Sequence, residues 1–149
     1  MNVIWAWVAV FALAGEAPTE SKKVDRPAEQ ATEESAEFSL TEVEADVLKL
    51  ANKERENRGL PPLEIDPELV EWAREHANWM ASTRTLRHTS KPVGENIATG
   101  QADSESAVRT WMNSPPHRAN ILGRAWSKIG AAAYTSPEGR IYWCLQFLR

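Results

Sequence analysis

The chain has 149 residues, of which 42% are hydrophobic and seven are tryptophan, so it can bury the core of one domain. Its formal net charge of −4 argues against nucleic-acid binding, which needs a clustered basic surface. The single cysteine, Cys144, excludes a fold stabilised by intramolecular disulfides. Its apolar neighbours indicate a small buried hydrophobic side chain rather than a reactive thiol.

Residues 1–15 form an apolar segment that ends abruptly. Ala12 and Ala14 flank Leu13 in the small-x-small pattern of signal cleavage, and the run is too short for an ordinary membrane-spanning helix. We therefore predict an export signal. An uncleaved N-terminal anchor is the alternative, because no Lys or Arg precedes the apolar run. Both predict a secreted or extracytoplasmic protein of the cell envelope, with no membrane span beyond such an anchor.

Residues 16–37 are polar, with seven acidic and three basic side chains. Such a segment cannot bury enough apolar surface to offset the entropy lost on ordering it, so we predict a disordered acidic linker. The chain has 17 basic and 21 acidic residues, so 14 of each sign remain for a domain at residues 38–149. That domain is therefore predicted to be neutral, which again argues against nucleic acid as a partner.

A first helix is predicted to begin near Ser39. Ser39 and Glu42 have the spacing of a capping box, and Phe38 and Val43 have that of a hydrophobic staple. The glycine and two prolines after residue 58 end the helix. The charged residues at 53–58 are interpreted as a solvent-facing surface.

A second helix is predicted from Pro67 to about Ser82, because Asp66 is a good N-cap and proline is favoured at the first helical position. Its predicted buried face comprises Leu69, Trp72, Ala73, His76, Ala77 and Met80. On this basis His76 is interpreted as a packed, hydrogen-bonded structural histidine rather than a ligand.

The remaining chain is predicted to be irregular at residues 83–102. A third helix then begins at Asp103 or Ser104, directs Trp111 inward and stops before Pro115, and one further helical turn covers residues 117–122. Two β-compatible runs at 128–135 and 140–147, separated by Ser-Pro-Glu-Gly, predict a hairpin. Helices followed by strands, without a βαβ rhythm, indicate an α+β domain with an antiparallel sheet.

Two imidazoles and one carboxylate are the candidate functional groups. His88 and Glu95 are placed in the predicted loop, and His117 follows the two prolines after the third helix. Irregular segments on a rigid scaffold carry many functional side chains. Two neutral imidazoles and a carboxylate are also ligands that a catalytic zinc uses, but His88 and His117 lack the short spacing of a preformed zinc motif.

Several short motifs follow one another along the domain: NKERENRGLPPLEIDPEL, AREHA, HTS, GENIA, WMNSPPHRANIL, IGAAA and YWCLQF. In this order they resemble a bacterial member of the CAP (SCP-like) superfamily, the cysteine-rich secretory protein, antigen 5 and pathogenesis-related 1 proteins. The resemblance covers residues 45–147. It implies an α-β-α sandwich with a small antiparallel sheet between helical layers, and a cleft that collects His88, Glu95 and His117. The position of a second glutamate found in many eukaryotic members is occupied by Ser114.

Three interpretations of this site remain open. His88, His117 and Glu95 are candidate ligands of Zn²⁺ or another divalent cation, supported by Asn96, Ser114 and Asn120 in the cleft and its loops. Alternatively, Glu95 orders the loop by accepting backbone N–H bonds, and the histidines bond to each other and to water. A third possibility is a nucleophilic set of Ser114, His117 and Glu95.

We expect an extracytoplasmic, monomeric binding module whose cleft takes a divalent metal, a small lipid, glycan or peptide, or both. The alternatives are a metal-dependent hydrolase of peptides or cell-envelope polymers and a structural or adhesive domain. The resemblance does not choose among them, because a fold alone does not assign an activity. The identity of the extracellular ligand stays open.

Overall fold

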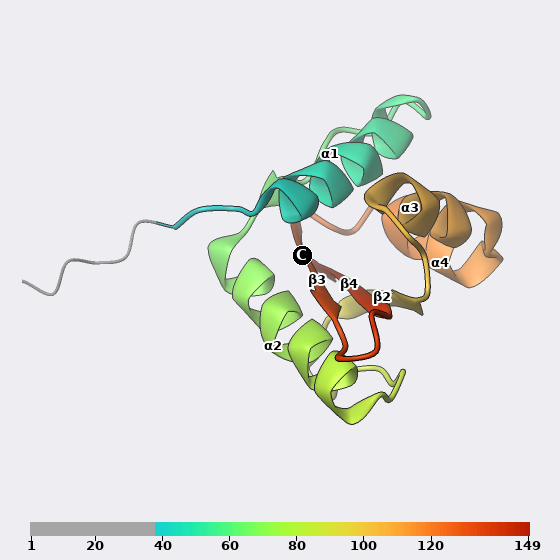
Figure 1. Cartoon of the computed structure of the whole chain (residues 1–149). Coiled ribbons are helices and arrows are strands. Elements are labelled where there is room, and N and C mark those ends of the chain that lie inside the picture. Colours follow the sequence, from blue (N-terminus) through green and yellow to red (C-terminus); the bar gives the residue numbers. More distant parts are fainter. Residues whose placement is uncertain (1–37) are drawn as a thin grey trace, which may run out of the picture. The chain divides into compact units, whose positions relative to one another are not determined.

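The computed structural model describes residues 38–149, so the predicted signal or anchor and the predicted linker lie outside the described residues. Four helices and four strands make up this part of the chain (Figure 1). In chain order they are α1 (Glu42–Glu56), β1 (Glu64–Ile65), α2 (Pro67–Thr83), β2 (Gly94–Thr99), α3 (Ser104–Asn113), α4 (Pro115–Ile121), β3 (Lys128–Thr135) and β4 (Ile141–Leu148). Within residues 38–149, no helix has both the length and the apolar character needed to cross a membrane.

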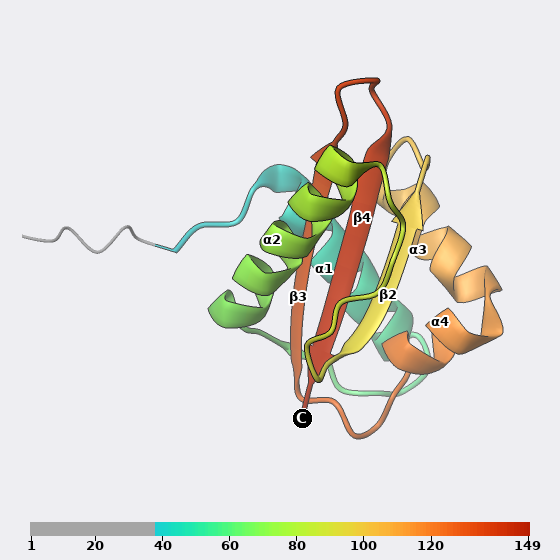
Figure 2. The ribbon, with the colours of Figure 1, turned by 90° about the horizontal axis from the view of Figure 1, so that it is seen from below.

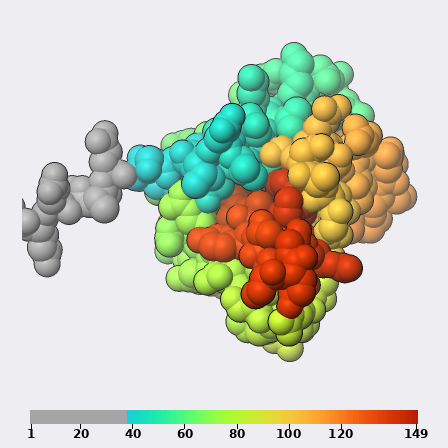
Figure 3. Space-filling model, in the orientation of Figure 1, coloured from blue at the N-terminus to red at the C-terminus, as the bar shows by residue number. Residues whose placement is uncertain are grey.

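The strands form one sheet between two helical layers. Helix α2 covers one face, and α1, α3 and α4 cover the other (Figures 1 and 2). The strand order is β1-β3-β4-β2, in which β3, β4 and β2 pair antiparallel and the two-residue β1 adds a parallel edge. The α+β class and the α-β-α sandwich are therefore confirmed. In Figure 3 the end of the β3–β4 hairpin reaches the surface between α2 and the residues around α3.

Strand β2 was not predicted, since residues 83–102 were expected to be irregular. Its four central residues, from Glu95 to Ala98, are all buried, because helices cover both faces of the sheet. It therefore lacks the alternation of apolar and polar residues that identifies a half-exposed strand. Its pairing partner β4 fixes the register, with Glu95 opposite Gln146.

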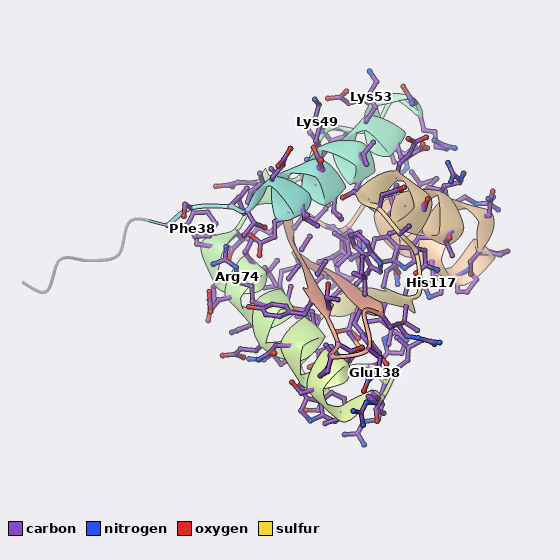
Figure 4. All side chains as sticks on the ribbon, in the orientation of Figure 1. Phe38, Lys49, Lys53, Arg74, His117 and Glu138 are labelled. Carbon is purple, nitrogen blue, oxygen red and sulfur yellow. The ribbon has the colours of Figure 1, made fainter. Side chains whose placement is uncertain are left out.

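Helix α1 begins two residues later than the capping pattern at Ser39 predicted. Thr41 is the N-cap, and its capping box closes with Glu44, whose Oε2 accepts from the Thr41 backbone N–H at 2.8 Å. Phe38 and Val43 are 43% and 42% exposed, so the predicted staple is wrong. The Arg74 side chain of α2 donates to both Glu44 carboxylate oxygens at 2.7 Å, and this contact between helices favours the later cap (Figure 4).

The interpretation of residues 53–58 as wholly solvent-facing is wrong for one side chain. Arg55 is 1% exposed and donates to three backbone carbonyls, those of Pro61 at 3.0 Å, Ile121 at 2.8 Å and Gly123 at 2.8 Å. It therefore joins the end of α1 to the chain on either side of the α4 C-terminus. Charge alternation in the sequence cannot reveal this contact, because two of the acceptors lie more than 60 residues away.

Helix α2 begins as predicted, with Asp66 accepting from the Leu69 backbone N–H at 3.1 Å. Its buried residues are Leu69, Val70, Ala73, Ala77, Met80 and Ala81, whereas Trp72 and His76 are half-buried at the margin of that face. The helix lies very close to β3. A Cβ on Gly130 would stand only 2.3 Å from the Leu69 carbonyl carbon, so glycine is required for this approach.

The helical layers enclose two apolar clusters, one on each face of the sheet. Trp111 belongs to the larger cluster, is fully buried and donates from Nε1 to the Ile97 carbonyl of β2 at 3.2 Å. The predicted inward direction of Trp111 is therefore confirmed. The same cluster includes residues of α1, α3 and α4, and it packs these helices against the sheet.

Candidate functional site

The centre of the candidate site is the Glu95 carboxylate, which lies on β2 and not in the predicted loop. Its side chain is 4% exposed. Oε2 accepts from His88 Nδ1 at 2.6 Å and from the Thr89 backbone N–H at 3.0 Å, while Oε1 accepts from Gln146 Nε2 at 3.0 Å. Cys144 Sγ lies 3.6 Å from Oε1. Both oxygens of this buried carboxylate are therefore engaged by protein donors.

His88 lies in the loop that leads from α2 to β2. Figure 2 shows that this loop runs on the same side of the sheet as α2. Its side chain is 60% exposed. A carboxylate can only accept a hydrogen bond, so Nδ1 carries the proton and donates it to Glu95. In the neutral imidazole, Nε2 is then the atom with a free lone pair. Glu95 thus fixes both the tautomer and the orientation of the exposed ring.

His117 lies in the first turn of α4, which begins at Pro115, two residues before the predicted helical turn (Figure 4). Its Nδ1 contacts the Ser114 Oγ at 2.9 Å. Burial lowers the pKa of His117 below its ordinary value, and positive charge on His88 lowers it further. Both effects favour the neutral form of the His117 ring.

Two asparagines connect the strand of Glu95 to the helix of His117. Asn96 is fully buried and donates from Nδ2 to the His117 carbonyl at 2.9 Å. Asn120 donates to Asn96 Oδ1 at 2.9 Å and to the Glu95 carbonyl at 3.1 Å. Each amide donates to a backbone carbonyl of the other element, so the pair links β2 to α4.

The nucleophilic alternative requires Ser114 to contact His117 and His117 to contact Glu95, and the described side chains do not form this series. Ser114 Oγ is beside His117, but the Glu95 side chain contacts His88 rather than His117. Ser114 also ends α3 and precedes α4, as both the C-cap and the N-cap residue. Its position is explained by the junction of the two helices.

Sequence reasoning did not place His76 at this site. His76 Nε2 lies 2.8 Å from the Arg87 carbonyl oxygen, and because a carbonyl only accepts, Nε2 donates. The same atom lies 3.7 Å from Glu95 Oε1, and the side chain is 11% exposed. The histidine is packed and hydrogen-bonded, and it also adjoins the carboxylate. Only a correct placement of β2 beside β4, in the sheet that α2 covers, could have predicted that proximity.

A family model described as "CAP: Cysteine-rich secretory protein family" matches residues 48–147, about two thirds of the chain. The chain belongs to this family. The match begins within α1 and ends on β4, so the CAP domain includes every element that carries the site.

Relatives of this CAP domain occur in bacteria. "Uncharacterized protein YkwD" of Bacillus subtilis (strain 168) is 35% identical over 152 residues, covering 91% of this chain and 56% of that protein. An extracellular SCP-domain protein of Bacillus anthracis has a TM-score of 0.65 and 23% identity, covering 75% of this chain and 45% of that one. NaASP2, in a crystal structure with Zn²⁺, has a TM-score of 0.54 and 16% identity over 74% and 82% of the chains. The chain therefore spans about half the length of the two bacterial proteins.

The donor set of the CAP domain fits two imidazole ligands better than the three predicted ligands. In the part of the chain that the structure describes, no three His, Cys, Asp or Glu side chains are grouped to hold one ion. Glu95 is already engaged through both oxygens. Within residues 38–149, His88 and His117 form side-chain hydrogen bonds only through Nδ1, so neither Nε2 atom has a protein partner there. Glu95 would then orient a ligand rather than act as one.

Cys144 is expected to be unreactive while the chain is folded. Burial raises the pKa of its thiol well above the ordinary value, and the adjacent Glu95 raises it further. The thiolate, which is the reactive form, is therefore scarce at pH 8. We expect labelling by a thiol reagent at pH 8 to be about a hundredfold slower or more in the native chain than in denaturant. Equal rates in the two conditions would show that the thiol is accessible.

Proposed function

We propose that this CAP domain is an extracytoplasmic binding module whose ligand is held by His88 and His117. One observation carries the proposal: each ring is fixed through Nδ1, by Glu95 at 2.6 Å and by Ser114 at 2.9 Å. Fixed rings with available Nε2 atoms need little reorganisation on binding. The B. anthracis relative, described as an extracellular protein, supports the proposed localisation.

We further propose that the ligand includes a divalent cation of the Zn²⁺ class. Neutral imidazole nitrogen is a preferred zinc ligand, and a histidine backed by a carboxylate is a frequent arrangement at zinc sites. The structure of NaASP2 with Zn²⁺ provides an example from a protein of the same fold. A zinc ion held by His88 and His117 would supply coordination positions for oxygen or nitrogen atoms of a further ligand.

The burial and the hydrogen bonds of Glu95 favour a binding function over hydrolysis. A general base must accept a proton from an attacking water, within hydrogen-bond reach. Glu95 is 4% exposed, and His88, Thr89 and Gln146 already donate to its oxygens. Glu95 is therefore placed to orient an imidazole, and not to accept a proton from an attacking water.

Titration of the purified chain with Zn²⁺ by calorimetry tests the proposal. We expect His88→Ala and His117→Ala each to weaken zinc binding at least about tenfold, which corresponds to about 1.4 kcal/mol. Affinity should also fall as the pH is lowered through the histidine range, because only neutral imidazole coordinates a metal. The depressed pKa of His117 delays its protonation to lower pH.

His76→Gln is the matched control, since glutamine can still donate to the Arg87 carbonyl that His76 contacts. It should retain the zinc affinity of the parent chain. A double variant, His88→Ala with His117→Ala, that binds zinc as tightly as the parent would contradict the proposal.

A further inference from the structure

A small cavity adjoins His88 at the C-terminal end of α2. It has a volume of about 300 Å³, at the lower limit of small-molecule pockets. Residues from α2 and from the loop that follows it line the cavity. They are His76, Trp79, Arg87, His88, Thr89 and Ser90. One indole and five hydrogen-bonding side chains therefore face one space, and His88 belongs both to this cavity and to the proposed imidazole pair.

Trp79 is an exposed aromatic side chain held in a fixed orientation. It is 37% exposed, its ring is stacked on His76 with a centroid distance of 5.8 Å and an interplanar angle of 9°, and Arg87 lies 5.2 Å from its centroid. A rigid aromatic surface loses little conformational entropy on binding. Sugar rings present apolar C–H groups on one face and hydroxyls around the edge, which match an indole bordered by polar side chains.

The charge of the cavity favours an anionic group. The Arg87 guanidinium forms no ion pair with the acidic side chains of residues 38–149. The nearby Glu95 carboxylate is buried and engaged by His88, Thr89 and Gln146. A guanidinium binds a carboxylate through two parallel hydrogen bonds, so a carboxylated ligand complements Arg87 better than a neutral one.

We propose that this cavity is a subsite for a sugar ring that carries a carboxylate, such as a uronic acid within an extracytoplasmic glycan. The exposed part of Trp79 packs against the C–H face of the sugar, and Arg87 pairs with the carboxylate. Thr89 and Ser90 hydrogen-bond to hydroxyl groups. This inference rests on the proposed function, because it names the chemical class of ligand that reaches His88.

Calorimetric titration of the full chain with an oligogalacturonate tests the subsite, with a cello-oligosaccharide of equal length as the neutral probe. EDTA is present throughout, because uronates themselves bind divalent metals. We expect the oligogalacturonate to bind about tenfold more tightly than the neutral probe. Trp79→Ala should weaken oligogalacturonate binding at least about tenfold, and Arg87→Gln should reduce it to the level of the neutral probe.

Trp72→Ala is the matched control. Trp72 lies on the same helix and also has a cation over its ring, Lys91 Nζ at 4.3 Å, but it does not line the cavity. It should retain oligogalacturonate affinity within about twofold, with circular dichroism confirming that both tryptophan variants are folded. Absence of oligogalacturonate binding by the parent, or equal losses in Trp72→Ala and Trp79→Ala, would overturn the proposal.

Zinc titrations of the same variants separate the subsite from the proposed function. Trp79→Ala should retain zinc affinity, because it removes no imidazole. A parent chain that binds zinc but not oligogalacturonate would refute the subsite and leave the proposed function standing. A chain that binds oligogalacturonate through Trp79 but shows no zinc binding by His88 and His117 would support the subsite and refute the metal site.

Discussion

Replacement of Trp111 by alanine is expected to lower the free energy of unfolding by about 3–5 kcal/mol, the range for deletion of a large buried aromatic side chain. Trp111 is fully buried between α3 and the sheet, so alanine leaves a cavity that the surrounding residues fill only partly. The variant also removes the donor to the Ile97 carbonyl on β2. Because β2 carries Glu95, the loss affects the strand that organises the candidate site.

Urea denaturation measures this effect, and Thr110→Ala is the control on the neighbouring position. Thr110 is exposed and donates only within its own helix, to the Ser106 carbonyl. Its replacement should change the free energy of unfolding by no more than about 0.5 kcal/mol. A loss below about 1 kcal/mol for Trp111→Ala would be incompatible with the packing of α3 described above.

Replacement of Arg55 by alanine is expected to lower the free energy of unfolding by at least about 3 kcal/mol. This is about 1 kcal/mol for each of the three carbonyls that lose a charged donor. These are the carbonyls of Pro61, Ile121 and Gly123. Arg55→Lys should show an intermediate loss, because one ammonium group cannot reproduce the fork of a guanidinium.

Arg58→Ala provides the comparison for Arg55. Arg58 lies three residues later, in the turn that follows α1, and forms an exposed pair with Glu54 of that helix. Such a pair contributes about 0.5 kcal/mol or less. Denaturation curves that show the same small loss for Arg55→Ala and Arg58→Ala would place Arg55 at the surface.

Local signals in the sequence predicted the elements whose ends and periods are encoded nearby. Asp66 and Pro67 mark the start of α2, and the turn at residues 136–139 separates β3 from β4 as predicted. Helix α4 was expected from residue 117 but starts at Pro115, because prolines that end one helix also suit the first turn of the next.

Contacts between distant residues account for the features that were missed. Strand β2 has no alternating pattern because both of its faces are covered, and its pairing with β4 joins residues about 50 positions apart. Arg55 is a buried donor because the chain at the end of α4 packs against α1 and presents the Ile121 and Gly123 carbonyls to it. The Thr41 cap depends in the same way on Arg74 of α2. Such effects of tertiary structure override local propensity.

The candidate site also combines features that the sequence predicted with features that depend on contacts between distant residues. His88, Glu95 and His117 were selected by their residue types and by the resemblance to the CAP family. Their distribution over a loop, a strand and a helix could not be derived from spacing. The division of roles between Glu95, which orients His88, and the two imidazoles, which keep Nε2 available, depends on the hydrogen bonds of the folded domain. His76 lies beside Glu95 because α2 packs over β3 and β4, and β2 is the next strand of the sheet.

The binding of one ion by two imidazoles can be observed directly by following the side-chain nitrogens of the three histidines with ¹H–¹⁵N correlation spectra during a zinc titration. Coordination engages the lone pair of Nε2 in the bond to zinc and shifts the Nε2 resonance. We predict that the Nε2 resonances of His88 and His117 shift together and saturate at one equivalent of zinc, while those of His76 do not move. Unchanged Nε2 resonances of His88 and His117 at saturating zinc would contradict the proposed site.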